Sequence, residues 1–196
     1  KEANYYTEEI RRIIKDNYGF DKLYAEGLSI KSALDVDYQL HALRALRSGI
    51  ESYDKRHGWR GPVSNTKNES NWRQKLKDKK IDSSLDWEFA EIININESGI
   101  EFKIVNKKNK NIKKIESSSL KWAITKTIQN SFKVNDIIFV KKNSKGKWDL
   151  KQYPKVNGAI VVIDPHNGKV KALVGGFSFE SSEFNRATQA RRQPGS

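Results

Sequence analysis

Apolar residues near the amino end recur every three or four positions, which is the spacing of one face of a helix. The pattern predicts two helices, the first ending at Gly19 and the second running from Tyr38 to about Tyr53 with Asp35 as its N-cap. A short apolar run at residues 28–34 predicts a strand between them. The apolar positions that define the two helices are Tyr6, Ile10, Ile13 and Ile14, and then Leu43, Leu46, Ile50 and Tyr53.

In the middle of the chain the period changes to two, as in a strand with one buried face. Three strands, a helical link and two further strands match the order of a five-stranded OB barrel. The expected segments are strands at 87–95, 100–104 and 112–115, turns at 97–99 and 106–111, a helical turn at 117–122, and strands at 137–140 and 148–153. The side chains expected on the core face of the first hairpin are Trp87, Phe89, Glu91, Ile93, Ile95, Ile100, Phe102 and Ile104.

Near the carboxyl end, two apolar runs at 159–163 and 170–174 flank the loop 164–168, which contains Pro, Asn and Gly. This composition is typical of a β-hairpin turn. Both runs are apolar at nearly every position, which predicts strands buried on both faces. We therefore expect residues 158–176 to pack on residues 28–34 or on chain outside residues 1–196.

The formal net charge is +13, and most of the excess lies in the middle of the chain. Residues 64–155 hold 21 of the 37 Lys and Arg residues but 11 of the 24 Asp and Glu residues, and Arg73 is the only arginine among those 21. Lysine is a solvated point charge, whereas arginine suits fixed paired geometry. The composition thus predicts three segments: 1–63, 64–155 and 156–196. The expected fold class is α+β, with an OB-like barrel inserted into a part made of helices and a short sheet.

Several kinds of chemistry are disfavoured by composition. The chain has no cysteine, which excludes disulfides and thiolate metal sites, and His41, His57 and His166 are far apart in sequence. We expect neither a metal nor a cofactor. No run of about 18 apolar residues is present, so no membrane span is expected within these residues.

The end of the sequence carries the most specific motif, R-A-x-Q-x-x-R-Q-x-G-S. It resembles the run that, in class A (bifunctional) penicillin-binding proteins, leads into the nucleophilic serine of an S-x-x-K motif. The segments 34–39 and 53–62 also resemble that family, in the part that joins its glycosyltransferase and transpeptidase domains. The matching residues of the terminal run are Arg186, Ala187, Gln189, Arg192, Gln193, Gly195 and Ser196.

The resemblance implies that Ser196 is the acyl-enzyme nucleophile, and that the motif's lysine lies beyond residue 196. It implies a parent enzyme that polymerises lipid-linked disaccharide and cross-links peptidoglycan stem peptides, and that β-lactams acylate. Residues 1–196 are then not catalytic on their own. The resemblance also implies a membrane anchor that precedes them, and it places these residues on the periplasmic face of the bacterial inner membrane. In one subgroup of the family an OB-like domain is inserted at this point, where an envelope regulatory protein could dock.

The main alternative is a stand-alone basic OB-fold module that binds a protein or a polyanion. Nucleic acid would need aromatic rings exposed in a basic groove. The strand pattern instead predicts Phe89, Phe102 and Phe139 on the core side, so we expect no nucleic-acid partner.

Overall fold

The computed structural model describes residues 2–25, 27–79, 81–105, 111–191 and 193, and the side chain of Leu23 is excluded as well. The chain divides into two compact units. The first unit comprises Lys1–Ile50 and Val156–Ser196, and the second unit comprises Glu51–Lys155.

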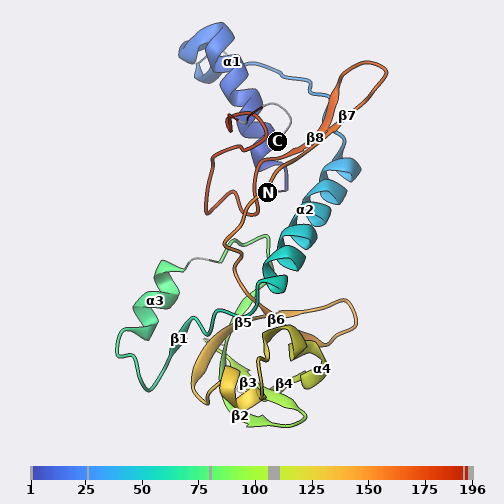
Figure 1. The fold of residues 1–196 in the computed structure, drawn as a ribbon. Helices are drawn as coiled ribbons and strands as arrows, with labels where there is room; N and C mark the ends of the chain where they lie inside the picture. The colour runs from blue at the N-terminus through green and yellow to red at the C-terminus, as the bar shows by residue number, and fades with distance from the viewer. Residues whose placement is uncertain (1, 26, 80, 106–110, 192, 194–196) are drawn as a thin grey trace. The chain divides into compact units, whose positions relative to one another are not determined.

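Figure 1 shows the elements of both units along the chain. The helices are α1 (Asn4–Tyr24), α2 (Val36–Arg56), α3 (Trp72–Asp78), α4 (Ser117–Leu120), the 3-10 turn η1 (Lys121–Ala123) and α5 (Ile128–Ser131). The strands are β1 (Ser64–Asn65), β2 (Glu88–Asn96), β3 (Gly99–Ile104), β4 (Lys113–Glu116), β5 (Asp136–Lys142), β6 (Trp148–Lys151), β7 (Ile160–Ile163) and β8 (Val170–Val174).

The second unit is built on one antiparallel sheet in the order β1-β5-β2-β3-β4, with β6 also paired to β5. β4 and β6 lie side by side, but in the described residues no backbone ladder joins them. Lys147, just before β6, instead forms an ion pair with Glu116 of β4 at 3.1 Å. The predicted order of strands and helical turn is confirmed, although the sheet has one more strand than expected and stays partly open. The turn predicted at 106–111 lies outside the described residues except for Asn111.

The core of the second unit lies on the face of β2 opposite to the predicted one. Ala90 and Ile92 are buried in the main cluster, whereas Glu91 forms an ion pair with Lys103 at 3.0 Å. A β-bulge after Ile92 then reverses the alternation, so that Ile95 packs against the same cluster. The predicted face was wrong because the prediction assumed an unbroken alternation along the whole strand. The bulge shifts the register by one residue, so the buried positions before and after it do not follow one alternation.

The aromatic rings of the sheet are divided between its two faces. Phe102 is fully buried in the main cluster, as predicted. Phe89 and Phe139 pack on each other with ring centroids 5.0 Å apart, and Trp87 lies 5.7 Å from Phe139. The prediction that Phe89 and Phe139 belong to the main core is therefore wrong: with Trp87 they form a separate aromatic group.

In the first unit, α1, α2 and the β7–β8 hairpin pack around a cluster of their own. α1 is interrupted where predicted, since Gly19 has φ +85°, but the chain returns to helix as far as Tyr24. Asp35 accepts from the N–H groups of Asp37 and Tyr38 at 3.1 and 3.2 Å, which confirms it as the cap of α2. The buried members of the cluster are Tyr5, Tyr6, Ala42, Ala172, Leu173 and Val174.

The strand predicted at residues 28–34 is absent, since residues 27–35 form neither helix nor strand. A side chain of α2 takes the place of a partner strand along β8. Gln39 is buried; its Nε2 donates to the Leu173 carbonyl at 3.2 Å, and the Leu173 N–H donates to Gln39 Oε1 at 2.9 Å. The Asp35 N–H donates to the Lys171 carbonyl at 2.9 Å. These bonds give partners to backbone N–H and C=O groups along the edge of β8, which a strand at 28–34 would otherwise have paired with.

The hairpin itself forms as predicted, with Val161 opposite Leu173 in an antiparallel ladder. Burial on both faces holds for the second half of β8 only. Val161 and Ile163 of β7 are 40% and 55% exposed. The uniform apolar pattern therefore identified the strands, but one face of β7 is open to solvent.

Candidate functional site

The segment that leads toward Ser196 starts at the end of β8, where two glycines permit close packing. A Cβ on Gly175 would collide with the Asn185 side chain and lie 2.8 Å from the Asn185 Cα. The Arg186 N–H donates to the Gly175 carbonyl at 3.1 Å. A Cβ on Gly176 would collide with the hydroxyl of Tyr5. A larger residue at position 175 would therefore displace the chain at Asn185, and one at position 176 would displace Tyr5.

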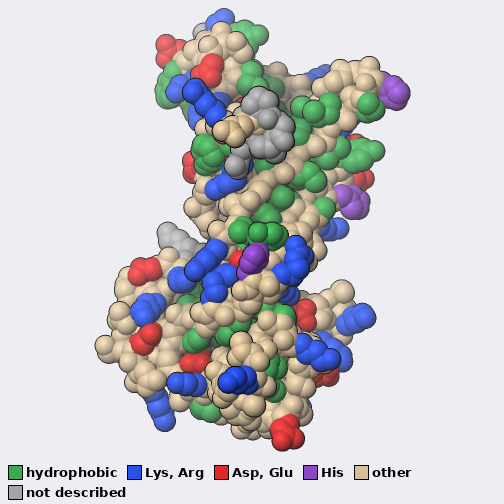
Figure 2. Space-filling model, in the orientation of Figure 1, with side chains coloured by type: hydrophobic (Ala, Val, Ile, Leu, Met, Phe, Trp, Pro, Cys, Tyr) green, Lys and Arg blue, Asp and Glu red, His purple; other side chains and the backbone are tan. Residues whose placement is uncertain are grey.

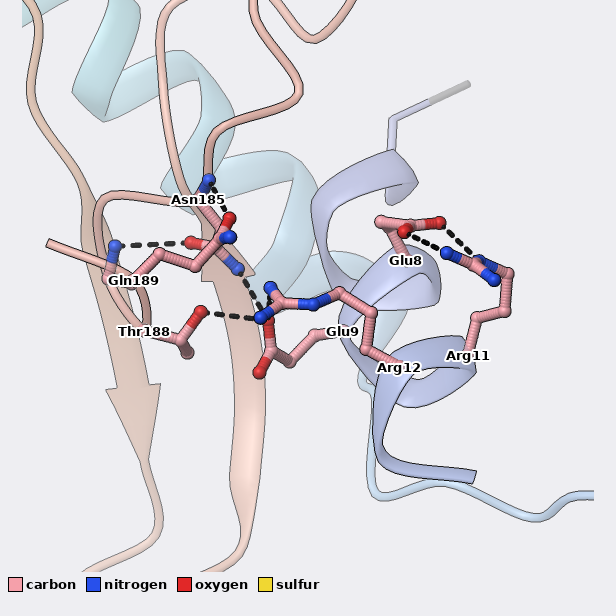
Figure 3. A network of polar contacts seen from close by, with 8 residues as sticks. Glu8, Glu9, Arg11, Arg12, Asn185, Thr188 and Gln189 are labelled. Carbon is pink, nitrogen blue, oxygen red and sulfur yellow. Dashed lines mark hydrogen bonds and ion pairs between the residues drawn. The ribbon is translucent and has the colours of Figure 1, made fainter. Parts of the chain in front are cut away.

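Residues 185–189 form a tight turn that is held by Asn185, which is 3% exposed. Its Oδ1 accepts from the Ala187 N–H at 3.1 Å, and its own N–H donates to Gln189 Oε1 at 2.7 Å. The Gln189 N–H donates back to the Asn185 carbonyl at 2.8 Å. Three of the residues that carry the sequence motif, Arg186, Ala187 and Gln189, are thus brought into one turn. Figure 3 shows Asn185 and Gln189 joined across it.

A carboxylate of α1 holds this turn from a distant part of the sequence. Glu9 Oε2 accepts from Thr188 Oγ1 at 2.7 Å and from Asn185 Nδ2 at 3.2 Å. It also pairs with Arg12 Nη1 of its own helix at 3.2 Å. Figure 3 shows the three donors gathered around the Glu9 carboxylate, while the neighbouring Glu8 pairs with Arg11.

Tyr5, one helical turn before Glu9, makes a second link between α1 and the loop that follows β8. Its hydroxyl donates to the carbonyl oxygens of Ser178 and Ser182, at 3.1 and 2.7 Å. Its ring packs edge-on against Phe179 with centroids 4.9 Å apart. α1 therefore contacts this loop both before and within the turn at 185–189.

The predicted nucleophile Ser196 lies outside the described residues, as do Arg192 and Gly195. Ser196 therefore stays a prediction. Sequence reasoning missed Glu9, Thr188 and Tyr5. A glutamate and a tyrosine in an amphipathic helix give no signal of a contact more than 170 positions away, and only the fold reveals these roles.

Neither a metal cluster nor a membrane-spanning helix is found in the part of the chain that the structure describes. Among those residues, no group of three or more His, Cys, Asp or Glu side chains is arranged to hold a metal ion. In the same part of the chain, no helix combines the length and apolar character that crossing a membrane requires.

The charges of the second unit are dispersed over its surface. Figure 2 shows basic side chains interspersed with acidic ones on the face in view. Some of the lysines lie in exposed or half-exposed ion pairs, such as Lys103 with Glu91 at 3.0 Å and Lys75 with Glu69 at 2.9 Å. This arrangement is typical of a solvated surface.

Comparisons with known proteins identify the family of the chain and agree with the fold described above. Residues 59–156 match the family model described as the penicillin-binding protein OB-like domain, which covers the sheet of the second unit. The chain belongs to the penicillin-binding protein family. The predicted resemblance and the OB-like α+β fold class are thereby confirmed.

Three similar proteins are each named penicillin-binding protein 1A. The chain is 36% identical over 198 residues to penicillin-binding protein 1A of Rickettsia typhi, with 99% of the chain and 25% of that protein covered. It is 32% identical over 207 residues to penicillin-binding protein 1A of Pseudomonas aeruginosa, covering 99% of the chain and 24% of that protein. The crystal structure of penicillin-binding protein 1A from Haemophilus influenzae matches with a TM-score of 0.76 at 31% identity, over 96% of this chain and 28% of that one. The chain thus spans about a quarter of the length of these relatives.

Proposed function

We propose that the chain is part of a bifunctional peptidoglycan synthase and carries the nucleophile segment of its D,D-transpeptidase, with Ser196 as the attacking residue. The turn at 185–189 supports this assignment most directly. It gathers Arg186, Ala187 and Gln189 of the motif into one turn that ends seven residues before the serine. The relatives that cover the whole chain are penicillin-binding proteins.

The proposed reaction is a two-step acyl transfer. Ser196 Oγ attacks the penultimate D-alanyl carbonyl of a stem peptide. A C–O bond forms, the C–N bond breaks, and D-alanine leaves with the proton that the serine gives up. The amine of a second stem peptide then attacks the ester, forms the cross-linking amide and returns a proton to the serine.

β-Lactams acylate the same oxygen by opening of their ring C–N bond. The amine then stays tethered to the acyl group, so the ester can persist as a covalent label.

The remaining functions belong to the parent protein. We include in the proposal that it polymerises lipid-linked disaccharide, that it is anchored in the inner membrane, and that these residues lie on the periplasmic face. The base that activates Ser196 is the lysine expected three positions further on. Residues 1–196 are not catalytic by themselves.

The experiment that tests the nucleophile uses the full-length protein in detergent. Fluorescent penicillin should label the wild type, and mass spectrometry should place the adduct on the peptide that contains Ser196. Ser196→Ala should abolish the label, whereas Ser118→Ala, at an exposed position of the second unit, should keep it. Equal labelling of Ser196→Ala and wild type contradicts the assignment.

The same proposal divides the chain into a linker region (1–63), an inserted OB-like domain (64–155) and the start of the transpeptidase domain (156–196). The inserted domain would dock an envelope regulatory protein. The division into a separate inserted domain is supported by a hydrophobic cluster whose members all come from the second unit. A stand-alone module for a protein or polyanion is the alternative.

A photo-crosslinking amino acid at Ser118 in the full-length protein tests docking in intact cells. A protein adduct of one defined mass is expected, and the same amino acid at Val36 of the first unit serves as the control. Absence of such an adduct from Ser118 and from other exposed positions of the second unit would contradict docking. A polyanion would instead bind the purified protein with an affinity that falls steeply as salt rises.

A further inference from the structure

We infer that Glu9 is a positioning residue for the nucleophile segment: its carboxylate fixes the turn at 185–189 from which the chain runs to Ser196. This inference rests on the proposed function. It adds a residue of α1, far away in the sequence, to the parts on which acylation depends.

The first support is the convergence of donors on a single oxygen. Glu9 Oε2 accepts from Thr188 and Asn185, at 2.7 and 3.2 Å, and also pairs with Arg12 at 3.2 Å. The Glu9 side chain is only 19% exposed. Hydrogen bonds to a charged acceptor are stronger than those between neutral groups, and partial burial reduces their screening.

The second support is the internal order of the turn that the carboxylate holds. Asn185 is buried and bonds to Ala187 and Gln189. The Arg186 N–H is bonded to Gly175 at the end of β8. A hydrogen bond to Thr188 or Asn185 therefore orients the whole turn rather than one side chain.

The third support is the short distance along the chain. Gln189 is seven residues before Ser196, and seven residues span at most about 25 Å. The contacts of Glu9 therefore act on backbone that is close to the serine along the chain. Misplacement of a reacting group by about 1 Å can lower a rate by as much as about 100-fold. Because the bond to Gly175 would remain, we expect loss of the Glu9 contacts to cost about tenfold.

α1 also supplies a matched control for this carboxylate. Glu8 is adjacent, is also a glutamate, and pairs with an arginine three residues later through bonds of 2.6 and 2.7 Å to Arg11. In the described residues its side chain has no hydrogen bond or ion pair to the turn at 185–189. Glu8→Ala removes the same charge from the same helix but leaves the contacts of Glu9 in place.

The experiment measures acylation of the full-length protein by fluorescent penicillin as a function of time and concentration. We expect Glu9→Ala to lower the first-order acylation rate at saturating penicillin about tenfold, with little change in the half-saturating concentration. Glu8→Ala should keep the wild-type rate. Glu9→Gln keeps an oxygen that can accept from Thr188 and Asn185, and it should recover most of the rate.

A second pair of variants separates positioning from general destabilisation. Thr188→Val should lower the rate in the wild-type background but should have little further effect in Glu9→Ala, because the shared bond is already lost. The unfolding temperatures of Glu9→Ala and Glu8→Ala should agree within about 3 °C.

Three results would overturn the inference: equal acylation rates for Glu9→Ala and Glu8→Ala, fully additive effects of Glu9→Ala and Thr188→Val, or a rate loss that follows a fall in unfolding temperature. None of these would affect the assignment of Ser196. Failure of the wild type to be labelled at Ser196 would instead remove both proposals.

Discussion

At the scale of single residues, Asp54 is the most heavily bonded carboxylate among the described interactions of the second unit. Arg60 grips both of its oxygens at 2.9 and 2.8 Å, and Gln152 and the Lys155 N–H add bonds of 2.8 and 3.1 Å. The Asp54 side chain is 4% exposed. Burial opposes its ionisation, but the hydrogen bonds from Arg60, Gln152 and Lys155 outweigh burial and hold the pKa of Asp54 below its usual value. One carboxylate thereby ties the beginning of the second unit to its end.

We predict that Asp54→Asn destabilises the second unit by about 3 kcal/mol, because Arg60 then loses its ionic partner in a partly buried site. Asp86→Asn is the control: Asp86 is 81% exposed and lies 3.8 Å from Lys141, and pairs of this kind contribute less than about 1 kcal/mol. Urea unfolding followed by tryptophan fluorescence measures both variants. The signal reports the second unit alone, since the five tryptophans are Trp59, Trp72, Trp87, Trp122 and Trp148. Equal urea midpoints for the two variants would show that the Asp54 network adds no stability.

The same carboxylate predicts a direction for the dependence of stability on pH. A group with a lowered pKa in the folded state binds its proton more readily when unfolded. Its stabilisation is therefore complete above the unfolded pKa of about 3.9 and is lost as the pH falls through the lower folded value. The difference in unfolding free energy between wild type and Asp54→Asn should be constant from pH 8 to about pH 5 and should shrink below about pH 4. A difference that grows on acidification would refute this account.

Two glycines should respond to alanine with opposite signs. Gly175→Ala places a methyl group against Asn185 and should destabilise the first unit by about 2 kcal/mol or more. Gly49, inside α2, has open space where its Cβ would lie, so Gly49→Ala should stabilise by about 1 kcal/mol through helix propensity. Thermal unfolding of the two variants, followed by circular dichroism, checks the pair. A shift of the same sign for both would contradict the packing described at Gly175.

At the scale of elements, the sequence predicted periodic segments well and missed the places where the chain changes phase. Asp35 and Gly19 act locally, through a cap and a positive φ, and could be read from a few neighbouring residues. The bulge after Ile92 could not, because one inserted residue reverses the buried face without altering the composition. The appearance of Glu91 on the predicted core face was the one available warning.

The missing strand at 28–34 has a comparable cause. Its apolar residues suit a strand, but the edge of β8 that it would have paired with is occupied by Gln39. A side-chain amide offers an N–H donor and a carbonyl acceptor side by side, like the backbone of a partner strand. The second N–H of Gln39 donates to the Glu2 carbonyl at 3.0 Å. This substitution depends on a residue pair 134 positions apart and leaves no local pattern.

We predict that Gln39→Ala opens this edge of β8. The buried N–H and carbonyl of Leu173 would lose their partners, at a cost of about 2 kcal/mol. Hydrogen exchange of the Leu173 amide should then accelerate about 30-fold in native conditions, the factor equivalent to that free energy. Ser48→Ala, an exposed substitution on the same helix, is the control and should leave the exchange unchanged. Unaltered protection in Gln39→Ala would mean that the side-chain amide does not stabilise β8.

At the scale of the whole molecule, the two hydrophobic clusters share no residue. Each takes its members from one unit, although the first unit is assembled from both ends of the chain. The site depends on this assembly, since Glu9 and Thr188 are 179 positions apart. Composition could indicate an inserted middle segment, but it could not indicate which residues of the two flanks meet, because contacts of this range are set by packing.

The separate clusters predict that the first unit can keep its fold and its chemistry without the second. We expect a full-length variant in which residues 57–155 are replaced by ten Gly and Ser residues, a linker with an average span of about 17 Å, to be acylated by penicillin within about threefold of the wild-type rate. The Leu173 amide should remain protected from exchange, because Gln39, Tyr5 and Glu9 are all retained. A variant that keeps this protection but is no longer acylated would show that the OB-like unit acts directly on the nucleophile. A variant that loses both would show that the first unit depends on the second for its stability, contrary to the independence that the two clusters predict.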